Sequence, residues 1–183
     1  MSIRIYGKRQ IQTLEGLATR PTSSRVREAV FNIWFERLQD ARWLDLCAGS
    51  GAMGAEALAR GVAQVTGIEK SSQACRIIEQ NWQKVAQADQ PFEVIRGDIK
   101  SALKKLMGPF DLAYFDPPYQ AKLYEPVLNS LGTSDLLQSG GAIAAEHHRD
   151  DSLSEHYGKL VQVKRKDYGQ TSVTFFDVTD DER

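Results

Sequence analysis

Cysteine, histidine and long apolar runs are all scarce in this chain of 183 residues. The two cysteines, Cys47 and Cys75, give no disulfide framework and no metal-ligand spacing, so a reducing cytoplasm is the expected compartment. The histidines include an isolated pair, His147-His148, which we interpret as a polar turn at a strand end rather than a metal site. No apolar run approaches transmembrane length, and the amino terminus lacks a signal-peptide core. We therefore expect a cytoplasmic protein that needs neither a membrane nor a metal.

Internal repeats and low-complexity linkers are also missing from the sequence. The hydrophobic fraction of 42% and the charged fraction of 26% are ordinary for a globular protein, and the length allows a full-sized core. We predict one domain over residues 21–183, preceded by a short basic extension over residues 1–20. We expect this protein to act as a monomer.

The net charge of −1 hides an uneven distribution along the chain. Residues 1–30 carry six basic and two acidic side chains, whereas residues 177–183 carry four acidic and one basic side chain. A basic end on a neutral body suits contacts with nucleic-acid phosphates. The alternatives are a solvated face and a salt-bridged helix start, and we expect one of the three arginines between residues 20 and 27 to be only structural. The candidate RNA-binding residues are Lys8, Arg9, Arg20, Arg25 and Arg27.

Apolar periodicity predicts a hairpin followed by alternating strands and helices. The hairpin strands, residues 3–6 and 10–14, flank a basic turn, and Thr22 or Ser23 can cap the first helix. Further strands are predicted at residues 43–46, 65–69, 92–96, 112–115, 142–146, 160–166 and 172–178. Helices are predicted at residues 24–39, 52–60, 71–86, 100–107 and 122–131, with a weak helix near residues 151–156.

The last two predicted strands are joined by the tight turn at Tyr168-Gly169, so they must be antiparallel. Repeated β–α units before this hairpin indicate a parallel sheet covered by helices. The expected fold is therefore α/β and Rossmann-like, with a seven-stranded, mostly parallel sheet that contains one antiparallel strand. The reversed strand is typical of methyltransferases and differs from the all-parallel sheet of dinucleotide-binding proteins.

The segment Gly49–Gly54 matches the glycine-rich fingerprint of dinucleotide-binding proteins, with Glu69 lying 20 residues beyond Gly49. Asp45 argues against a dinucleotide, because its carboxylate would face a pyrophosphate at close range in a poorly solvated crevice. S-Adenosyl-L-methionine has no phosphate and carries a sulfonium and an ammonium, so the same carboxylate attracts it. We therefore favour S-adenosyl-L-methionine as the cofactor over NAD.

Other strand ends supply acceptors for the adenosine part of this cofactor. Glu69 can accept both ribose hydroxyls, Asp98 can accept from the adenine amine, and Ile99 can cover the ring. Helix capping is the alternative role for Asp98 and for Asp45. The expected cofactor-binding residues are Asp45, Ala48, Gly49, Ser50, Gly51, Glu69, Lys70, Asp98 and Ile99.

The tetrapeptide Asp116-Pro117-Pro118-Tyr119 follows an apolar run that predicts a buried parallel strand. It therefore lies at the sheet edge where open α/β folds bind their ligands. The prolines remove two backbone donors, so acceptors face the crevice, and Tyr119 offers a flat surface to a planar ring. A structural turn after a strand is the alternative interpretation. We predict that these four catalytic residues act on the exocyclic amine of a nucleobase.

Such an amine is a poor nucleophile, because its lone pair is conjugated into the ring. The amine would donate its two hydrogens to the Asp116 carboxylate and the Pro117 carbonyl. These two hydrogen bonds would favour a pyramidal geometry at the nitrogen. Tyr119 would stack on a base that is single-stranded or turned out of a helix. Asp116 could take the proton after transfer, when the product ammonium is strongly acidic, so this chemistry needs no raised pKa.

Five segments of the sequence together point to one family. They are Arg20-Pro21-Thr22 with Arg25–Asn32, Leu44–Gly51, Glu69-Lys70, Asp116–Tyr119 and Tyr168–Thr171. The chain resembles the bacterial 16S ribosomal RNA guanine-N2 methyltransferases of the RsmD type, nearly from end to end. It departs from that pattern at Cys47, where an aromatic residue is expected, and at Gln170, where an acidic residue is expected.

The resemblance implies methylation of one guanine N2 amine in 16S ribosomal RNA, on an assembling small subunit rather than on a free duplex. It also implies that the basic hairpin and residues 20–27 hold RNA or shape the cofactor pocket. Because Asp-Pro-Pro-Tyr also occurs in DNA amine methylases, a DNA adenine-N6 methyltransferase is an alternative, although 183 residues leave no room for a target-recognition domain. A non-catalytic RNA-binding protein on the same fold is the other alternative.

Overall fold

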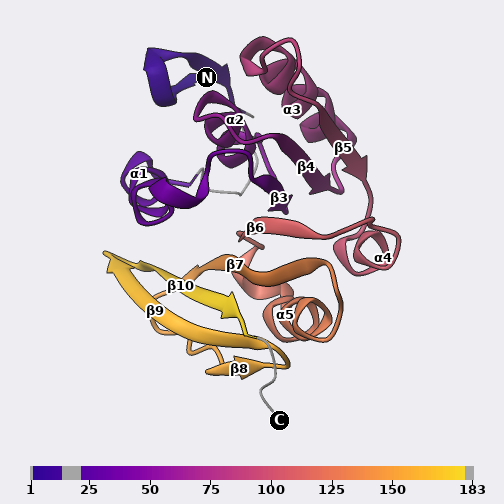
Figure 1. Cartoon of the computed structure of the whole chain (residues 1–183). Helices are drawn as coiled ribbons and strands as arrows, with labels where there is room; N and C mark the ends of the chain where they lie inside the picture. Colours follow the sequence, from indigo (N-terminus) through magenta and orange to yellow (C-terminus); the bar gives the residue numbers. More distant parts are fainter. Residues whose placement is uncertain (1, 14–21, 180–183) are drawn as a thin grey trace.

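A mixed sheet runs through the molecule, with helices on both of its faces (Figure 1). The computed structural model describes residues 2–13 and 22–179. The sheet strands are β3 (Arg42–Leu46), β4 (Gln64–Glu69), β5 (Phe92–Arg96), β6 (Phe110–Phe115), β7 (Leu137–His148), β8 (His156–Tyr157), β9 (Leu160–Tyr168) and β10 (Thr171–Val178). The helices are α1 (Ser24–Ile33), α2 (Ala52–Ala59), α3 (Ser72–Val85), α4 (Ile99–Leu103) and α5 (Tyr124–Gly132).

Three short 3-10 turns and a small separate sheet complete the described part of the chain. The turns are η1 (Tyr6–Lys8), η2 (Phe35–Arg37) and η3 (Tyr119–Ala121), and the small sheet pairs β1 (Ser2–Arg4) with β2 (Gln10–Gln12). This N-terminal hairpin and the β9–β10 hairpin lie at opposite ends of the molecule (Figure 1). The predicted boundary between extension and domain lies between residues 20 and 21. It falls within residues 14–21, which lie outside the described residues.

The strand order β5-β4-β3-β6-β7-β10-β9-β8 confirms the predicted methyltransferase fold. Strands β5, β4, β3, β6 and β7 are parallel, and β10 inserts antiparallel between β7 and β9. All seven strands predicted for this sheet are present. The additional strand, β8, has only two residues and pairs antiparallel with β9. A segment this short has no periodicity from which a strand could be predicted.

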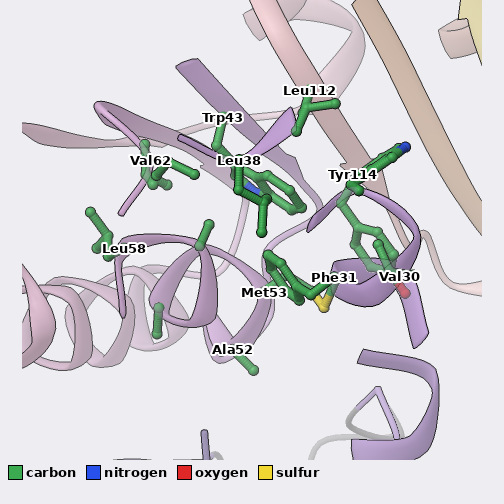
Figure 2. Packing of buried hydrophobic residues seen from close by; sticks show 14 of the residues in the cluster. Val30, Phe31, Leu38, Trp43, Ala52, Met53, Leu58, Val62, Leu112 and Tyr114 are labelled. Carbon is green, nitrogen blue, oxygen red and sulfur yellow. The ribbon is translucent and has the colours of Figure 1, made fainter. Parts of the chain in front are cut away.

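Two hydrophobic clusters hold the helices against the sheet. One lies under α1, α2 and α3 and includes Trp43, whose ring stacks on Phe31 with 5.1 Å between centroids (Figure 2). The other lies under α4 and α5 and includes Phe115 and Leu128. Fully burying one such side chain stabilises the fold by about 1.5–3 kcal/mol. The two clusters therefore fix the central strands from both faces, and with them the sheet edge that carries the predicted site.

The first helix is shorter than the prediction of residues 24–39. Ser23 caps it as expected, accepting from Val26 N at 3.2 Å, but α1 ends at Ile33 and continues only as the turn η2. Trp34, at the helix end, packs edge-on against Phe175, and Arg37 donates to the Asp177 carboxylate. These contacts with β10 are tertiary, so helical periodicity alone could not place the helix end.

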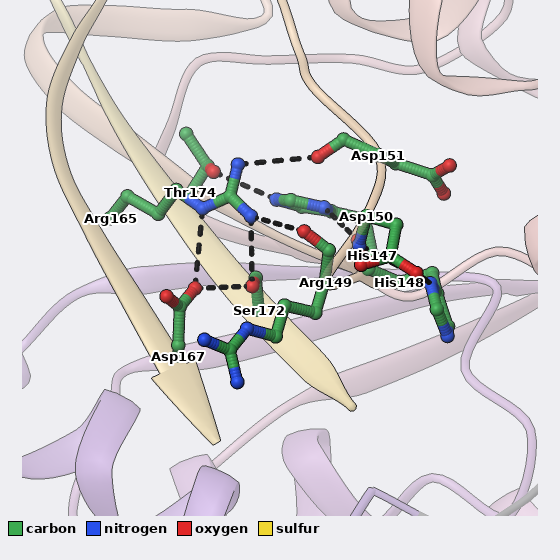
Figure 3. A network of polar contacts seen from close by, with 9 residues as sticks. All are labelled: His147, His148, Arg149, Asp150, Asp151, Arg165, Asp167, Ser172 and Thr174. Carbon is green, nitrogen blue, oxygen red and sulfur yellow. Dashed lines mark hydrogen bonds and ion pairs between the residues drawn. The ribbon is translucent and has the colours of Figure 1, made fainter. Parts of the chain in front are cut away.

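The weak helix predicted near residues 151–156 is wrong, because this segment forms a loop leading into β8. The Arg165 guanidinium on β9 donates to the backbone carbonyls of Arg149 and Asp151, and Asp167 and Ser172 hold it in place (Figure 3). These carbonyls are satisfied by a side chain from a distant strand instead of by a helix. The prediction failed because it counted only local preferences.

Buried ionic contacts fasten the N-terminal hairpin to the body. Arg27 Nε lies 2.7 Å from Glu56 Oε2, with 3% and 2% of the two side chains exposed, and Arg27 Nη2 donates to Arg4 O at 2.6 Å. Arg60 pairs with the other Glu56 oxygen at 2.8 Å and also lies over the Tyr6 ring at 4.5 Å. Arg27 is therefore enclosed by the hairpin, α1 and α2, and its guanidinium offers no exposed face to RNA.

Replacing Arg27 with methionine should destabilise the fold by about 3 kcal/mol, because it leaves a buried carboxylate with only Arg60 as partner. Arg25→Met is the matched control, since Arg25 is exposed on the same helix and its loss should change stability by about 0.5 kcal/mol or less. Urea denaturation of both variants measures the difference. Equal stabilities would contradict a structural role for Arg27.

Candidate functional site

A cavity of about 290 Å³ opens at the carboxyl ends of β3, β4 and β6. Nearly all of the predicted cofactor-binding residues line it, namely Asp45, Ala48, Gly49, Ser50, Glu69, Lys70, Asp98 and Ile99. Asp116 and Pro118 of the predicted catalytic set line it as well. Gly51, Pro117 and Tyr119 are not among the lining residues, although each is the immediate neighbour of one. The structure thus brings together two sets that are far apart in sequence.

The glycine loop wraps one wall of the cavity. Gly49 and Gly51 adopt positive φ of 58° and 72°, and Cys47 does so as well with a φ of 61°. A Cβ on Gly49 would meet only Cys47 O, at 4.0 Å, and the Gly49 N–H donates to the Glu69 carboxylate at 3.0 Å. The backbone at Gly49 can therefore approach a ligand closely, which is the role that the sequence predicts for this loop.

Gly51 and Gly54 have a different role, which the sequence analysis missed. A Cβ on Gly54 would lie 2.3 Å from Trp82 Cζ2, and one on Gly51 would lie 2.7 Å from Trp82 Nε1. The indole fills this space and donates from Nε1 to Gly51 O at 2.8 Å. The packing of α3 against the loop and α2 therefore requires glycine at both positions, and cofactor contact by Gly51 stays a prediction.

Asp45 lies at the base of the cavity, with 2% of its surface exposed. One carboxylate oxygen accepts from Gly54 N at 2.9 Å, so Asp45 ties the start of α2 to β3. Burial raises the pKa of this carboxyl to about 7, with a smaller contribution from the Glu69 charge, while the Gly54 hydrogen bond opposes the shift.

The two acids of the predicted adenosine site both hold the backbone around them. Glu69 accepts from Gly49 N and Ser71 N, at 3.0 and 2.9 Å, and so links the glycine loop to the start of α3. Asp98 caps α4 by accepting from Lys100 N and Ser101 N. Asp98 therefore has the capping role that was the alternative for it, and it also lines the cavity. Ligand contacts by either acid stay predictions.

Asp116 continues the ladder beyond β6, with its N–H donating to Leu46 O at 3.4 Å. Thr22 Oγ1 lies 3.3 Å from Asp116 Oδ2. Pro117 is buried and Pro118 is exposed. The Tyr119 ring, 38% exposed, lies with its hydroxyl 3.3 Å from Thr171 Oγ1 and its centroid 6.0 Å from the His148 ring. An acidic acceptor therefore lines the cavity, and a partly exposed aromatic side chain follows the lining residue Pro118 directly.

The environment of Asp116 differs from the one expected. Burial, the nearby Glu146 charge and the more distant Asp45 charge raise the pKa of Asp116 well above the ordinary range, and the Thr22 hydrogen bond opposes them only in part. The chemistry predicted from the sequence required no raised pKa, and Glu146 was not among the predicted site residues. The signal was weak, because Glu146 and Tyr114 sit inside apolar strand segments and look like core positions.

The predicted RNA-binding residues divide into two groups. Lys8, Arg9 and Arg25 are exposed, Arg9 donates to Val85 O at 3.0 Å, and Arg25 lies 5.9 Å from the centre of the Tyr168 ring. Arg27 is buried against Glu56, so the structure contradicts its prediction as an RNA contact. Arg20 lies outside the described residues.

The residues present fit S-adenosyl-L-methionine. The cavity wall combines acidic side chains with the open backbone of Gly49, a set that suits a ligand with two positive centres and no phosphate. The buried Thr13 hydroxyl in the same wall has no hydrogen-bond partner among the described residues, so a ligand hydroxyl or amine could satisfy it.

Residues 2–13 and 22–179 contain neither a metal-binding cluster nor a membrane-spanning helix. No group of three or more acidic, histidine or cysteine side chains in these segments could hold a metal ion. No helix within the same two segments is long and apolar enough to cross a membrane.

The family model described as "Conserved hypothetical protein 95" matches residues 3–177. The chain belongs to this family. One relative, from Bacillus subtilis, is named "Putative rRNA methyltransferase YlbH" and is 33% identical over 92% of both chains. Another, from Escherichia coli, is named "Ribosomal RNA small subunit methyltransferase D" and is 31% identical over 82% of this chain and 77% of its own. The RsmD-type resemblance is confirmed.

Solved structures agree with this assignment. The structure titled "Putative methyltransferase yhhF from Escherichia coli" is 29% identical, has a TM-score of 0.86, and covers 98% of this chain and 99% of its own. An RNA methyltransferase from Salinibacter ruber, solved with S-adenosyl-L-homocysteine, is 16% identical with a TM-score of 0.66, covers 90% of this chain and 97% of its own, and shows the shared fold.

Replacing Asp45 with asparagine should flatten the pH dependence of stability. The pKa of Asp45 is raised to about 7, so its contribution to stability is complete below the ordinary value of 3.8 and is lost as the pH rises through 7. Asparagine keeps the acceptor for Gly54 N but has no proton to lose. Between about pH 5 and about pH 8, the wild type should lose on the order of 2 kcal/mol more stability than the variant, measured by urea denaturation. Parallel pH curves would show that Asp45 is ionised throughout.

Proposed function

We propose that this protein methylates the exocyclic N2 amine of a guanine in small-subunit ribosomal RNA, with S-adenosyl-L-methionine as methyl donor. The observation that carries the proposal is Asp116 in the wall of a cavity that fits this donor, with the partly exposed Tyr119 directly after the lining residue Pro118. The names of the relatives supply the class of RNA. The RsmD-type resemblance supplies the guanine N2 atom and the assembling subunit, in the bacterial cytoplasm, as the state on which the protein acts.

The chain contributes acceptors and a stacking surface to this reaction. Asp116 and the Pro117 carbonyl accept the two amine hydrogens, which turns the nitrogen lone pair toward the cavity. The Tyr119 ring stacks on the base, and Thr171 and His148 limit the positions that this ring can adopt. Both contacts come from the sheet end that contains the β9–β10 turn, so the terminal hairpin helps to orient the base.

S-Adenosyl-L-methionine supplies a methyl group already activated by a sulfonium. The protein therefore accelerates the reaction by aligning the reactants and by electrostatic stabilisation. Alignment of this kind can lower the activation free energy by on the order of 7–11 kcal/mol. Asp116 accepts the amine proton once the new N–C bond has formed. No described residue has to act as a nucleophile.

The exposed basic residues support an RNA partner. Lys8 and Arg9 lie on the N-terminal hairpin, and Arg25 lies at the start of α1, beside the Tyr168 ring. Because Tyr119 can reach only a base that is not stacked in a helix, the target guanine is single-stranded or turned out of its helix. The RNA is thus held through its phosphates while one base enters the site.

Transfer of a labelled methyl group to assembling small subunits, free 16S RNA and DNA tests the function. Nucleoside analysis should recover the label as N2-methylguanosine from ribosomal RNA. Recovery as N6-methyladenosine, or from DNA alone, would overturn the proposal. Cofactor binding without transfer to any substrate would indicate a non-catalytic RNA-binding protein.

Replacing Asp116 with alanine should abolish methyl transfer while changing cofactor affinity by no more than a few-fold, because the carboxylate serves the amine rather than the cofactor's adenosine. Turnover with 16S RNA and calorimetric binding of S-adenosyl-L-homocysteine measure the two effects separately. Asp135→Asn, an exposed carboxylate remote from the cavity, is the control. Near-normal turnover in Asp116→Ala would remove the residue from the mechanism.

Removing the charges of Lys8 and Arg9 together should weaken RNA binding and flatten its salt dependence by about 0.9 in slope for each phosphate that the variant no longer binds. The control is a double variant at Lys104 and Lys105, at the end of α4. It removes two positive charges from a part of the molecule that is far from the hairpin (Figure 1). Affinity measured by filter binding over a range of salt distinguishes the two double variants. Identical slopes would exclude the hairpin as a phosphate-binding edge.

A further inference from the structure

Thr13 places a buried hydroxyl in the wall of the cavity. It lies directly after β2, lines the cavity and is only 6% exposed. Its Oγ1 has no hydrogen-bond partner among the described residues. A buried hydroxyl without a partner is unfavourable, so it needs an explanation in a native protein. Trp43 Nε1 is also unpaired, but it belongs to the hydrophobic core, whereas Thr13 faces a space that a ligand can fill.

Hydrogen bonds to the preceding residue fix the position of Thr13. The Asn81 side chain on α3 accepts from Gln12 N at 2.8 Å and donates to Gln12 O at 2.9 Å. The same amide donates to Ser50 O in the glycine loop, also at 2.9 Å. The end of β2 is therefore held against α3 and the glycine loop, and Thr13 is kept in the cavity wall.

The other described hydroxyl groups of this wall are satisfied without a ligand. Tyr114, Thr22 and Ser71 each make a hydrogen bond within the protein. Ser50 is only half-buried, so water can satisfy its hydroxyl. Thr13 can therefore donate to a ligand without giving up a hydrogen bond inside the protein, and it gains the partner that it lacks.

The carboxylate of the methionine part is the group of the cofactor that most needs a donor in this cavity. The charged side chains of the described wall are four acids and one lysine, namely Asp45, Glu69, Asp98, Asp116 and Lys70. The acids attract the ammonium and the sulfonium but repel the carboxylate. Lys70 is exposed and directly follows Glu69, on the side predicted for the adenosine. A hydroxyl donor stabilises a carboxylate through a charge-assisted hydrogen bond.

We propose that the Thr13 hydroxyl donates a hydrogen bond to the carboxylate of S-adenosyl-L-methionine, so that the N-terminal hairpin forms part of the cofactor site. The hairpin then serves both ligands, because Lys8 and Arg9 are its proposed contacts with RNA. The inference rests on the proposed function for the methyl donor alone, and not for the base that is methylated.

Two ligands that differ only in the carboxylate test this contact without any RNA. They are S-adenosyl-L-methionine and its decarboxylated form, and calorimetry measures the affinity of each. Thr13→Val keeps the shape of the side chain but removes the hydroxyl. It should weaken binding of S-adenosyl-L-methionine about tenfold or more and that of the decarboxylated form by less than about twofold. Thr13→Ala should show the same selectivity, and Thr13→Ser, which keeps the hydroxyl, should retain most of the affinity.

The stability of the cofactor-free protein is an independent measurement. Thr13→Val should not lower the midpoint of urea denaturation, because no hydrogen bond inside the protein is lost. Thr174→Val is the matched control, since Thr174 is 1% exposed and its Oγ1 lies 2.8 Å from His147 Nε2. This control should lower the midpoint, because the buried ring nitrogen loses its partner.

Three results would overturn the proposal. The first is an unchanged affinity of Thr13→Val for S-adenosyl-L-methionine, and the second is an equal loss of affinity for both ligands. The third is a midpoint that falls as far in Thr13→Val as in Thr174→Val, which would show that the hydroxyl has a partner inside the protein. None of these results depends on methyl transfer, so the contact can fail while the proposed methylation stands. Conversely, labelled products other than N2-methylguanosine would overturn the base assignment and leave the Thr13 contact unaffected.

Discussion

The gathering of carboxyl groups at the carboxyl ends of adjacent strands is the constraint on which the rest of the site depends. Asp45, Asp116 and Glu146 stand on one face of three adjacent strands, β3, β6 and β7, at register positions set by the parallel pairing. Burying such charges is unfavourable unless they are neutralised or paired. Asp45, whose pKa burial raises to about 7, therefore favours a proton or a cationic ligand, and a sulfonium is a cation of this kind.

The packing around this edge preserves its geometry. Trp82 fills the space left by Gly51 and Gly54, which places the glycine loop, and Asn81 beside it donates to Ser50 O and Gln12 O, both at 2.9 Å. The N-terminal hairpin is thereby joined to the loop that lines the cavity. The proposed RNA-binding hairpin and the proposed cofactor-binding loop are therefore joined directly through Asn81.

Much of the fold and half of the chemistry could be predicted from the sequence. Asp45 and Glu69 lie in the last residues of β3 and β4, and Asp116 follows β6 directly. The carboxyl ends of parallel strands converge, so local pattern and topology place these acids together. Glu146, Tyr114 and Thr22 could not be found in this way. Their role depends on register between strands and on a loop, and Glu146 looks like the last residue of a core strand. Arg27 was mistaken for an RNA contact for the same reason, since only tertiary packing reveals Glu56 as its partner.

The protonation state of Asp116 can be observed directly, through the carboxyl ¹³C chemical shift of the labelled residue as the pH is varied. The environment of Asp116, buried and close to the Glu146 charge, predicts that this carboxyl keeps its proton above the pH range of an ordinary carboxyl in the free protein. It also predicts that Glu146→Gln lowers the pKa of Asp116 in the free protein. An Asp116 that is already ionised at about pH 5 in the free wild type, close to the range of an ordinary carboxyl, would contradict the account.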